Sequence, residues 1–280
     1  MGFYSPSTLV QDARRHGVEV RPVDVAASDW ECTLERSDAH AVSLPPPAVR
    51  LGLLMVKGLS QAAGVRIAAA RSIRPFDDVA DLARRAALNR SDLSRLAAAG
   101  ALAPLAGHRR NAHWLAAGME RSTELFDSTA IQEDLPGLEP PRESDDLLAD
   151  YQSLGLTLGR HPLALLRSRL ARMRMSTASE LHALPDGKRA RTVGIVTCRQ
   201  RPGTAQGVVF VTLEDETGHV NVVVWRDLVE RQRRELLGSR LLGVEGVLQK
   251  EGDVAHLVAH RLVDHSRLLG RLTLESRDFH

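Results

Sequence analysis

The segment LLMVKGLS, Leu53 to Ser60, contains residue types that suit a phosphate group. Gly58 allows a tight bend and lets backbone amides approach an anion, and the amides that open the next helix point outward as donors. Lys57 and Arg66 would add positive charge beside the bend. We therefore predict a site that grips DNA phosphates without reading the bases, because phosphates carry no base information.

An apolar helix end, the Lys57-Gly58 bend and a new helix, AAGVRIAAAR, together form a helix-hairpin-helix pattern. Ser60 stands where this motif usually has its second glycine, so a small residue is kept but the match is weaker. The alternative interpretation is a turn that merely connects two helices, which is the commoner meaning of a glycine at such a place.

The segment AGHRR, Ala106 to Arg110, offers a second basic cluster at the end of the same helical region. His108, Arg109 and Arg110 could contact a phosphate. A solvated, basic helix start explains them equally well.

A third candidate lies in the last third of the chain, where Arg199 and Arg201 precede the turn Pro202-Gly203. In a small nucleic-acid-binding barrel, the loop between the first two strands borders the binding groove. Single strands also need aromatic platforms for base stacking, and this region offers Phe210 and Trp225. We expect weak or assisted binding of single strands, and either aromatic residue could instead belong to the core.

The charge arrangement is more informative than the formal net charge of +2. An acidic stretch from Glu120 to Asp150 is followed by a basic stretch from Arg160 to Arg201, and we count Lys188 and Arg189 in the latter among the candidate DNA-binding residues. A solvated helix face is the alternative explanation.

No set of side chains converges on catalysis. The run Glu214, Asp215 and Glu216 enters a turn, and alternate residues of a strand face opposite sides, so we interpret it as a solvated turn and not a metal site. The histidines and the two cysteines, Cys32 and Cys198, lack metal-ligand spacing, and neither a phosphate-binding Walker loop nor a GxSxG elbow occurs. We predict two thiols that form no disulfide, no catalytic residue, and no metal or cofactor in this chain.

These residues must be positioned by at least two kinds of element. The pattern of residues 7–16 predicts a helix that has Ser7 as its N-cap and ends at Gly17. Residues 18–25 are expected to form a strand. The segment 49–117 is expected to form several short helices rich in Ala, Leu and Arg. Proline runs at 45–47 and around 135–143 indicate boundaries, and helices are expected at 144–158 and from Pro162 onward.

The last third changes its periodicity to that of strands. We expect strands at 191–197, 207–213, 220–225, 240–248 and 254–262, with a helix at about 227–237 between the third and the fourth. This order is typical of an OB-fold, a five-stranded Greek-key barrel. The predicted fold class is therefore α+β and multidomain: an all-α helix-hairpin-helix region followed by an OB-fold β-barrel.

At 280 residues the chain is long enough for two or more cores, and no apolar run reaches the length of a membrane span. The first residues, MGFYSPSTLV, do not form a signal peptide pattern. We expect a cytoplasmic protein with no membrane partner.

Several segments, in the same order, resemble bacterial C-family DNA polymerases, the DNA polymerase III alpha-like enzymes. The first 25 residues look like the stretch after the catalytic palm, LGLLMVKGLS like the helix-hairpin-helix segment, and DYQSLGLTLGRHPLALLR like the segment leading to the OB domain. FVTLEDETGHVNVVVW resembles the OB signature, and the ending Ser276 to His280 is similar to the C-terminus of the error-prone, translesion branch.

This resemblance implies a C-terminal part of a nucleotidyltransferase that acts in DNA replication and in damage-tolerant repair synthesis, with DNA, a sliding clamp and accessory mutagenesis proteins as partners. The metal-binding palm would precede Met1, so magnesium is expected only in a complete polymerase, and this chain should bind duplex phosphates and single-stranded template without polymerising. The alternative is a protein-interaction module that docks polymerase partners. The implied domains are a fingers-like fragment (1–47), the helix-hairpin-helix region (48–118), an acidic linker (119–143), a helical connector (144–190), the OB domain (191–265) and a tail (266–280).

Overall fold

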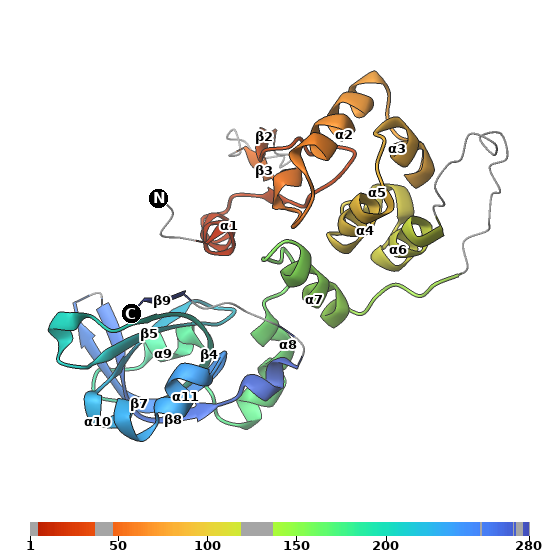
Figure 1. Ribbon diagram of the computed structural model, residues 1–280. Coiled ribbons are helices and arrows are strands. Elements are labelled where there is room, and N and C mark those ends of the chain that lie inside the picture. The colour runs from red at the N-terminus through yellow and green to blue at the C-terminus, as the bar shows by residue number, and fades with distance from the viewer. Residues whose placement is uncertain are drawn as a thin grey trace, which may run out of the picture. The chain divides into compact units, whose positions relative to one another are not determined.

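The computed structural model describes residues 5–36, 47–118, 137–252, 254–270, 272 and 277–279. The chain divides into two compact units, unit 1 (Met1–Leu158), which is mainly helical, and unit 2 (Gly159–His280), which contains the barrel (Figure 1). Most of the predicted acidic linker, Pro45 and Pro46, and much of the predicted tail lie outside the described residues.

Unit 1 begins with helix α1 (Pro6–Arg15), which is capped by Ser5 and not by Ser7. Pro6 suits the first helical position, because the N–H that it lacks would have no partner there, so the residue before it is the cap. The Ser5 hydroxyl accepts a hydrogen bond from the amide of Thr8 at 3.2 Å. Gly17 ends the segment as predicted, with φ at +79°.

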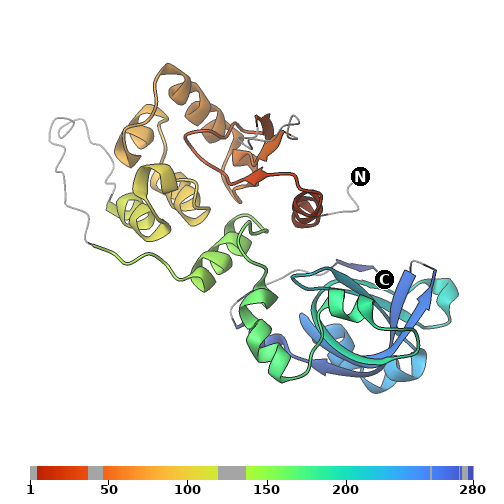
Figure 2. The same cartoon turned by 180° about the vertical axis from the view of Figure 1, so that it is seen from behind.

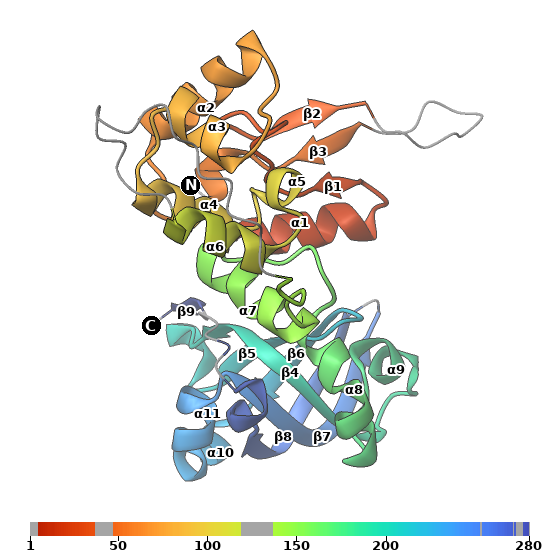
Figure 3. The ribbon, with the colours of Figure 1, turned by 90° about the vertical axis from the view of Figure 1, so that its right-hand side faces the viewer.

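A small sheet follows α1 and has the order β1-β3-β2 (Figure 3). Its strands are β1 (Val20–Arg21), β2 (Thr33–Glu35) and β3 (Ala48–Arg50). The predicted strand at 18–25 is thus much shorter, since Pro22 cannot donate to a ladder. Val23 and Val25 are nevertheless buried, in one core with Ile67 and Leu102 of the helical region.

Glu35 of β2 links its own strand to the other two strands of this sheet. Its carboxylate accepts from Arg50 Nε at 2.9 Å and from Arg21 Nη1 at 2.7 Å. The hydrogen bond from Arg50 is the largest cause that lowers the pKa of Glu35 to about 2; burial acts against it, and the hydrogen bond from Arg21 adds to the lowering.

The remainder of unit 1 is helical, as the sequence predicts. Side chains of Ser60, Asp78 and Asn89 cap successive helices by accepting backbone amides at N3. The elements are η1 (Leu53–Met55), α2 (Gln61–Ile73), α3 (Val79–Arg85), α4 (Arg90–Ala98), α5 (Ala103–Ala106), α6 (Arg109–Gly118) and α7 (Glu143–Ser153).

Unit 2 begins with α8 (Pro162–Arg172), whose first helical residue is proline, and α9 (Ala178–Ala183). The barrel strands are β4 (Arg189–Gln200), β5 (Val209–Glu214), β6 (His219–Val224), β7 (Leu241–Glu251) and β8 (Val254–Asp264). They pair in the order β5-β6-β8-β7-β4, and a further β4–β5 pairing closes the barrel, whose curving strands are visible from behind in Figure 2. The short turns η2 (Gly203–Ala205) and η3 (Ser266–Leu269) and the strand β9 (Arg277–Phe279), which pairs with β4, complete the unit.

The predicted fold class, helices followed by a five-stranded barrel, is confirmed. The single helix expected at 227–237 is instead two, α10 (Arg226–Arg231) and α11 (Arg233–Gly238). The break falls at Gln232, whose amide side chain donates to the carbonyl of Leu262 and accepts from its N–H, both at 2.8 Å.

The acidic run after β5 is a buried structural network and not the solvated turn that the sequence indicates. Glu214 and Asp215 are 8% and 3% exposed. The Nε2 atoms of His161 and His219 lie 3.6 and 3.4 Å from the carboxylate oxygens of Glu214. Burial alone would raise the pKa of Glu214, but these imidazoles hold it well below its usual range.

Asp215 accepts from the first amide of α9, that of Ala178, at 2.7 Å, and Arg167 of α8 donates to Glu216 at 2.8 Å. The run therefore fastens two helices to the barrel. No helix within the described residues is both long and apolar enough to cross a membrane.

Candidate nucleic-acid interface

The hairpin bend of unit 1 lies at the surface, with Lys57, Gly58 and Ser60 all exposed. Gly58 has φ at +79°, a left-handed conformation that favours glycine. The Ser60 hydroxyl accepts from the amide of Ala63 at 3.2 Å and so begins α2 at this surface. A phosphate could therefore reach the bend and the start of the helix.

The element before the bend is a single 3-10 turn, Leu53–Met55, and not the end of an α-helix. The amides of Leu53 and Leu54 donate to the carbonyls of Asp29 and Trp30 at 2.8 and 2.9 Å. Gly52 fits directly against the backbone of Glu31, where a Cβ would lie 2.3 Å from the carbonyl carbon. These two amides are therefore bonded to a neighbouring segment of the chain and do not donate to carbonyls of a preceding helical turn.

Lys57 is exposed but anchored at both ends. Its backbone N–H donates to the carbonyl of Ser153 at 2.8 Å, and its Nζ donates to the carbonyl of Tyr151 at 3.1 Å. Both acceptors are at the C-terminal end of α7, where carbonyl oxygens have no partner within the helix. The ammonium group is thereby held at a defined place beside the bend.

Arg95, which the sequence analysis missed, also lies beside the bend. A Cβ built on Gly58 would meet its Nε at 3.0 Å. Arg66 is exposed on α2, and its Nε and Nη2 donate to the carbonyls of Ala86 and Ala87 at 2.8 and 3.2 Å, after the end of α3. Arg95 had no local signal, because only the fold brings α4 to the hairpin.

The cluster around α6 divides into an inner and an outer arginine. Arg109 has a largely buried side chain that donates to Asp146 at 2.7 Å, to Asp150 and to the carbonyl of Ala98 at 3.0 Å. Arg110 is exposed and donates to the carbonyl of Glu139 at 3.1 Å. Arg109 therefore joins α6 to α7, and Arg110 remains the candidate for phosphate contact.

His108, the third residue of this cluster, is half-buried. Its Nε2 lies 3.1 Å from the carbonyl oxygen of Leu138, and its Nδ1 accepts from the amide of Asn111 at 3.3 Å. With both ring nitrogens engaged, it serves the local structure at the start of α6.

The barrel exposes both predicted aromatic residues, Phe210 at 38% and Trp225 at 57%. Phe210 pairs with Val223 across β5 and β6, and Trp225 follows two positions later on the same outward side. A Cβ on Gly207 would lie 3.6 Å from Nη2 of Arg201 and 3.4 Å from Cδ of Arg226. We call Phe210, Trp225, Arg201 and Arg226 the aromatic face.

Arg199 does not belong to that face, because it is buried at 6% exposure. Its Nε donates to the carbonyl of Leu236 at 2.7 Å, and its Nη2 donates to that of Ser239. The pairing of β4 with β5 shifts between Val196 and Cys198, so Arg199 lies opposite Val211 on the inward side. The alternation expected from the sequence is reversed by this bulge, and Arg199 is a structural residue.

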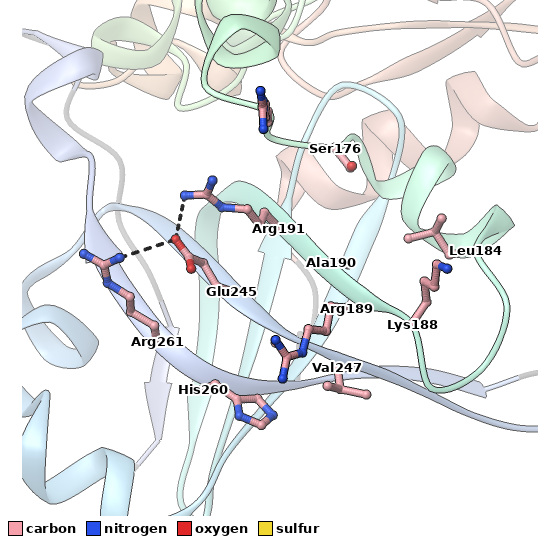
Figure 4. Close-up of a pocket in the computed structure, with 12 residues that line it drawn as sticks. Ser176, Leu184, Lys188, Arg189, Ala190, Arg191, Glu245, Val247, His260 and Arg261 are labelled. Atoms are coloured by element: carbon pink, nitrogen blue, oxygen red, sulfur yellow. Dashed lines mark hydrogen bonds and ion pairs between the residues drawn. The ribbon is translucent and has the colours of Figure 1, made fainter.

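Lys188 and Arg189 line a different surface of the barrel, an open groove of about 620 Å³ (Figure 4). Arg189 belongs to the half of β4 that pairs with β7, whereas Phe210 lies on β5. The other basic residues of this groove are Arg174 and Arg191, which belong to the basic stretch of the sequence but were not chosen as site residues, and His260 and Arg261, which the sequence analysis missed.

The two cysteines are thiols, as predicted, and form no disulfide. Cys32 accepts a hydrogen bond from the amide of Gly52 at 3.3 Å. Within the described ranges, no three His, Cys, Asp or Glu side chains gather in a way that could hold a metal ion.

Both units match models of nucleic-acid-binding families. Residues 17–112 match a family described as the helix-hairpin-helix motif, and residues 190–264 match one described as the OB-fold nucleic acid binding domain. A solved asparaginyl-tRNA synthetase from Pyrococcus horikoshii aligns with 32% of this chain and 22% of its own, at 25% identity and a TM-score of 0.28, which is too low to bear on function.

Curated relatives match the chain over its full length. It is 60% identical to the error-prone DNA polymerase of Azoarcus sp. (strain BH72), and 57% identical to that of Aromatoleum aromaticum, covering 26% of each. The error-prone DNA polymerase of Alkalilimnicola ehrlichii is 55% identical, with 27% covered. The chain thus spans about a quarter of the length of these relatives. Over its full length the chain is therefore similar in sequence to a part of the error-prone DNA polymerases, the branch of the bacterial C-family enzymes that its motifs resemble.

Proposed function

We propose that this chain holds template DNA for an error-prone DNA polymerase during replication and damage-tolerant synthesis in the bacterial cytoplasm. The hairpin of unit 1 grips duplex phosphates, and the aromatic face of unit 2 stacks bases of the single-stranded template. The observation that carries this proposal is the exposed Lys57-Gly58 bend, with its left-handed glycine and the guanidinium of Arg95 beside it.

Two kinds of contact support a division of labour. Backbone amides and cations around a glycine bend hold phosphates of any sequence, which suits a duplex that slides past a polymerase. Exposed aromatic rings stack on unpaired bases, which a duplex does not offer. Phe210 and Trp225 are exposed on the barrel, and they have Arg201 and Arg226 nearby for the backbone of the strand.

The chemical step of the complete enzyme, with its magnesium ions, is assigned in this proposal to carboxylates outside this chain. The chain alone then binds DNA and adds no nucleotide. Contacts with a sliding clamp and with accessory mutagenesis proteins belong to the same proposal, and they rest on the family resemblance of the sequence alone.

The test is fluorescence anisotropy of the 280-residue chain with single-stranded, duplex and primed DNA over a range of salt. Log affinity should fall linearly with log salt for all three, and a magnesium-dependent primer-extension assay should show no product. Absence of salt-dependent DNA binding would overturn the proposal and favour a module that docks other proteins. Primer extension by the pure chain would overturn the assignment of the chemistry.

A further inference from the structure

The groove of Figure 4 contains a row of three charged residues across three adjacent strands. Arg191 of β4 pairs with Glu245 of β7, and Glu245 pairs with Arg261 of β8. Arg191 Nη2 and Arg261 Nη1 lie 2.6 and 3.7 Å from the same oxygen, Oε1 of Glu245. Glu245, at 28% side-chain exposure, is more sheltered than Arg191 at 45% or Arg261 at 65%. One carboxylate thus holds two guanidinium groups in place.

A β-bulge adds a further basic group to this row. The β7–β8 register shifts between Glu245 and Gly246, so that His260 is the extra residue on β8 and lines the groove together with Arg261. The bulge depends on Gly246, because a Cβ there would lie 2.2 Å from the carbonyl oxygen of Val258. The bulge at Gly246 therefore accounts both for the close approach of β7 to β8 and for the position of His260 in the groove.

The rest of the lining is also basic. Arg189 lies two residues before Arg191 on the same side of β4, about 7 Å along the strand. Lys188 and Arg174 complete the lining cations. Arg174 has φ at +58°, a left-handed conformation after α8 where glycine would be unstrained, yet the chain places an arginine there. Glu245 is the one carboxylate among the lining residues that the structure describes.

We propose that this groove is a second phosphodiester-binding site, separate from the aromatic face, and that Glu245 occupies its central guanidinium pair until a phosphate displaces it. The proposal rests on the DNA-binding function proposed above and names a second contact surface for it. The ligand is the backbone of a nucleic-acid strand, recognised through charge and not through its bases.

The chemistry of the lining favours phosphodiesters. Most of the lining cations are arginines, whose planar forks match phosphate oxygens in pairs. Arg189 and Arg191 place two positive charges in a line along β4, which suits the evenly spaced negative charges of a nucleic-acid backbone. Among the described lining residues there is no Phe, Tyr or Trp, so the groove offers charge without a large aromatic platform for bases.

The experiment measures salt-dependent affinity of the full chain for a fluorescent dT 20-mer and for a 20-base-pair duplex. The double variant Arg189→Gln/Arg191→Gln should bind at least one of these probes more weakly. Its log–log salt slope should be shallower by about 1.4 for a single strand or about 1.8 for a duplex, the change for two lost phosphate contacts. Arg231→Gln, an exposed arginine of α10 that does not line the groove, is measured alongside it as a control.

Glu245→Gln is the decisive variant, because it should raise affinity by about two- to fivefold, the range of an exposed ion pair. A gain cannot arise from misfolding. Glu31→Gln, an exposed acid of unit 1, makes the same change in net charge and should give a smaller gain.

The outcomes separate the two proposals. If the unmodified chain binds neither probe, the proposed function itself fails. If it binds and Phe210→Ala weakens that binding, while the groove variants behave like Arg231→Gln and Glu31→Gln, only the second site is overturned. That result would indicate that the groove binds an acidic surface of another protein and not a nucleic-acid strand.

Discussion

The backbone N–H of Lys57 donates to the carbonyl of Ser153 at 2.8 Å, so the hairpin bend is tied to the end of α7. The Lys57 ammonium is bound to the same helix end, through the carbonyl of Tyr151. Two carbonyls at the end of one helix therefore hold the backbone and the ammonium group of Lys57, and a phosphate would otherwise have to order this cation on binding. A preorganised cation loses less side-chain entropy when it binds.

Replacing Lys57 with alanine should weaken duplex binding uniformly across DNA sequences. The log–log salt slope should become shallower by about 0.9, since one phosphate contact is lost. Anisotropy titrations with two unrelated duplexes would measure this. Arg84→Ala, which removes an exposed cation of α3 that pairs with Asp81, is the matched control, and an equal effect of both variants would contradict a specific role for Lys57.

Alanine at Trp225 should weaken single-strand binding by about 1–3 kcal/mol, the value of one base stacked on an aromatic ring. Duplex binding should change little, because paired bases are not free to stack on Trp225. Anisotropy with a dT 20-mer and with a duplex gives the comparison. Leu237→Ala, another exposed apolar residue of unit 2, should leave both affinities unchanged. Equal losses for the two probes would exclude stacking.

Replacing Arg199 with alanine should destabilise unit 2 by about 2–4 kcal/mol. The variant loses charge-assisted hydrogen bonds and leaves the carbonyls of Leu236 and Ser239 without these donors. Urea unfolding followed by tryptophan fluorescence, in a chain whose Trp30 and Trp114 are replaced by phenylalanine so that Trp225 reports unit 2, would measure the loss. Arg201→Ala, on the exposed loop, should unfold like the parent chain, and similar stability of both variants would refute the structural role of Arg199.

Gly64→Ala should destabilise unit 1, although alanine is the better helix former by about 1 kcal/mol. Gly64 lies in α2 against the ring of Trp30, and a Cβ would come within 2.5 Å of Cε3. The ring or the helix must move, and the core they share would loosen. Urea unfolding compared with Ala68→Gly, which should cost only the helix propensity, would test this; a stabilised Gly64→Ala variant would show that the ring adapts freely.

Acid should weaken unit 1 through Glu35. The folded-state pKa is about 2 and the ordinary value is 4.5, so the carboxylate contributes stability above about pH 4.5. That contribution should disappear as the pH falls from about 4.5 through about 2. Urea midpoints of the parent and of Glu35→Gln should converge over this interval, and a gap that stays constant would contradict the linkage.

The helices and the barrel strands could be predicted because their periodicities are local. The alternation from Val209 to Leu213, for example, is visible in the sequence and buries the expected face. The N-cap is Ser5 and not the predicted Ser7, because Pro6 favours the first helical position. This preference is also a local rule. The sequence analysis applied the rule two residues too late.

The candidate site was harder to predict, since it depends on partners distant in sequence. Arg109 and Arg110 are neighbours, yet Arg109 lies between two helices, whereas Arg110 is exposed and pairs with Asp145 at the surface. Arg261 is separated from Arg191 by the whole barrel meander, and only strand pairing brings them to one carboxylate. The acidic turn at Glu214 looked solvated because the two histidines that pair with it come from other segments.

The bulge in β4 reverses which side chains of that strand face outward: odd-numbered residues do so before the bulge and even-numbered residues after it. Before the bulge Arg189 and Arg191 face outward, and after it Gln200 faces outward while Arg199 faces inward. Inserting or deleting a single residue would exchange the two sets, whereas a change of two would preserve them. A change of one residue in this strand would therefore turn the Arg199 side chain away from its acceptors at the end of α11.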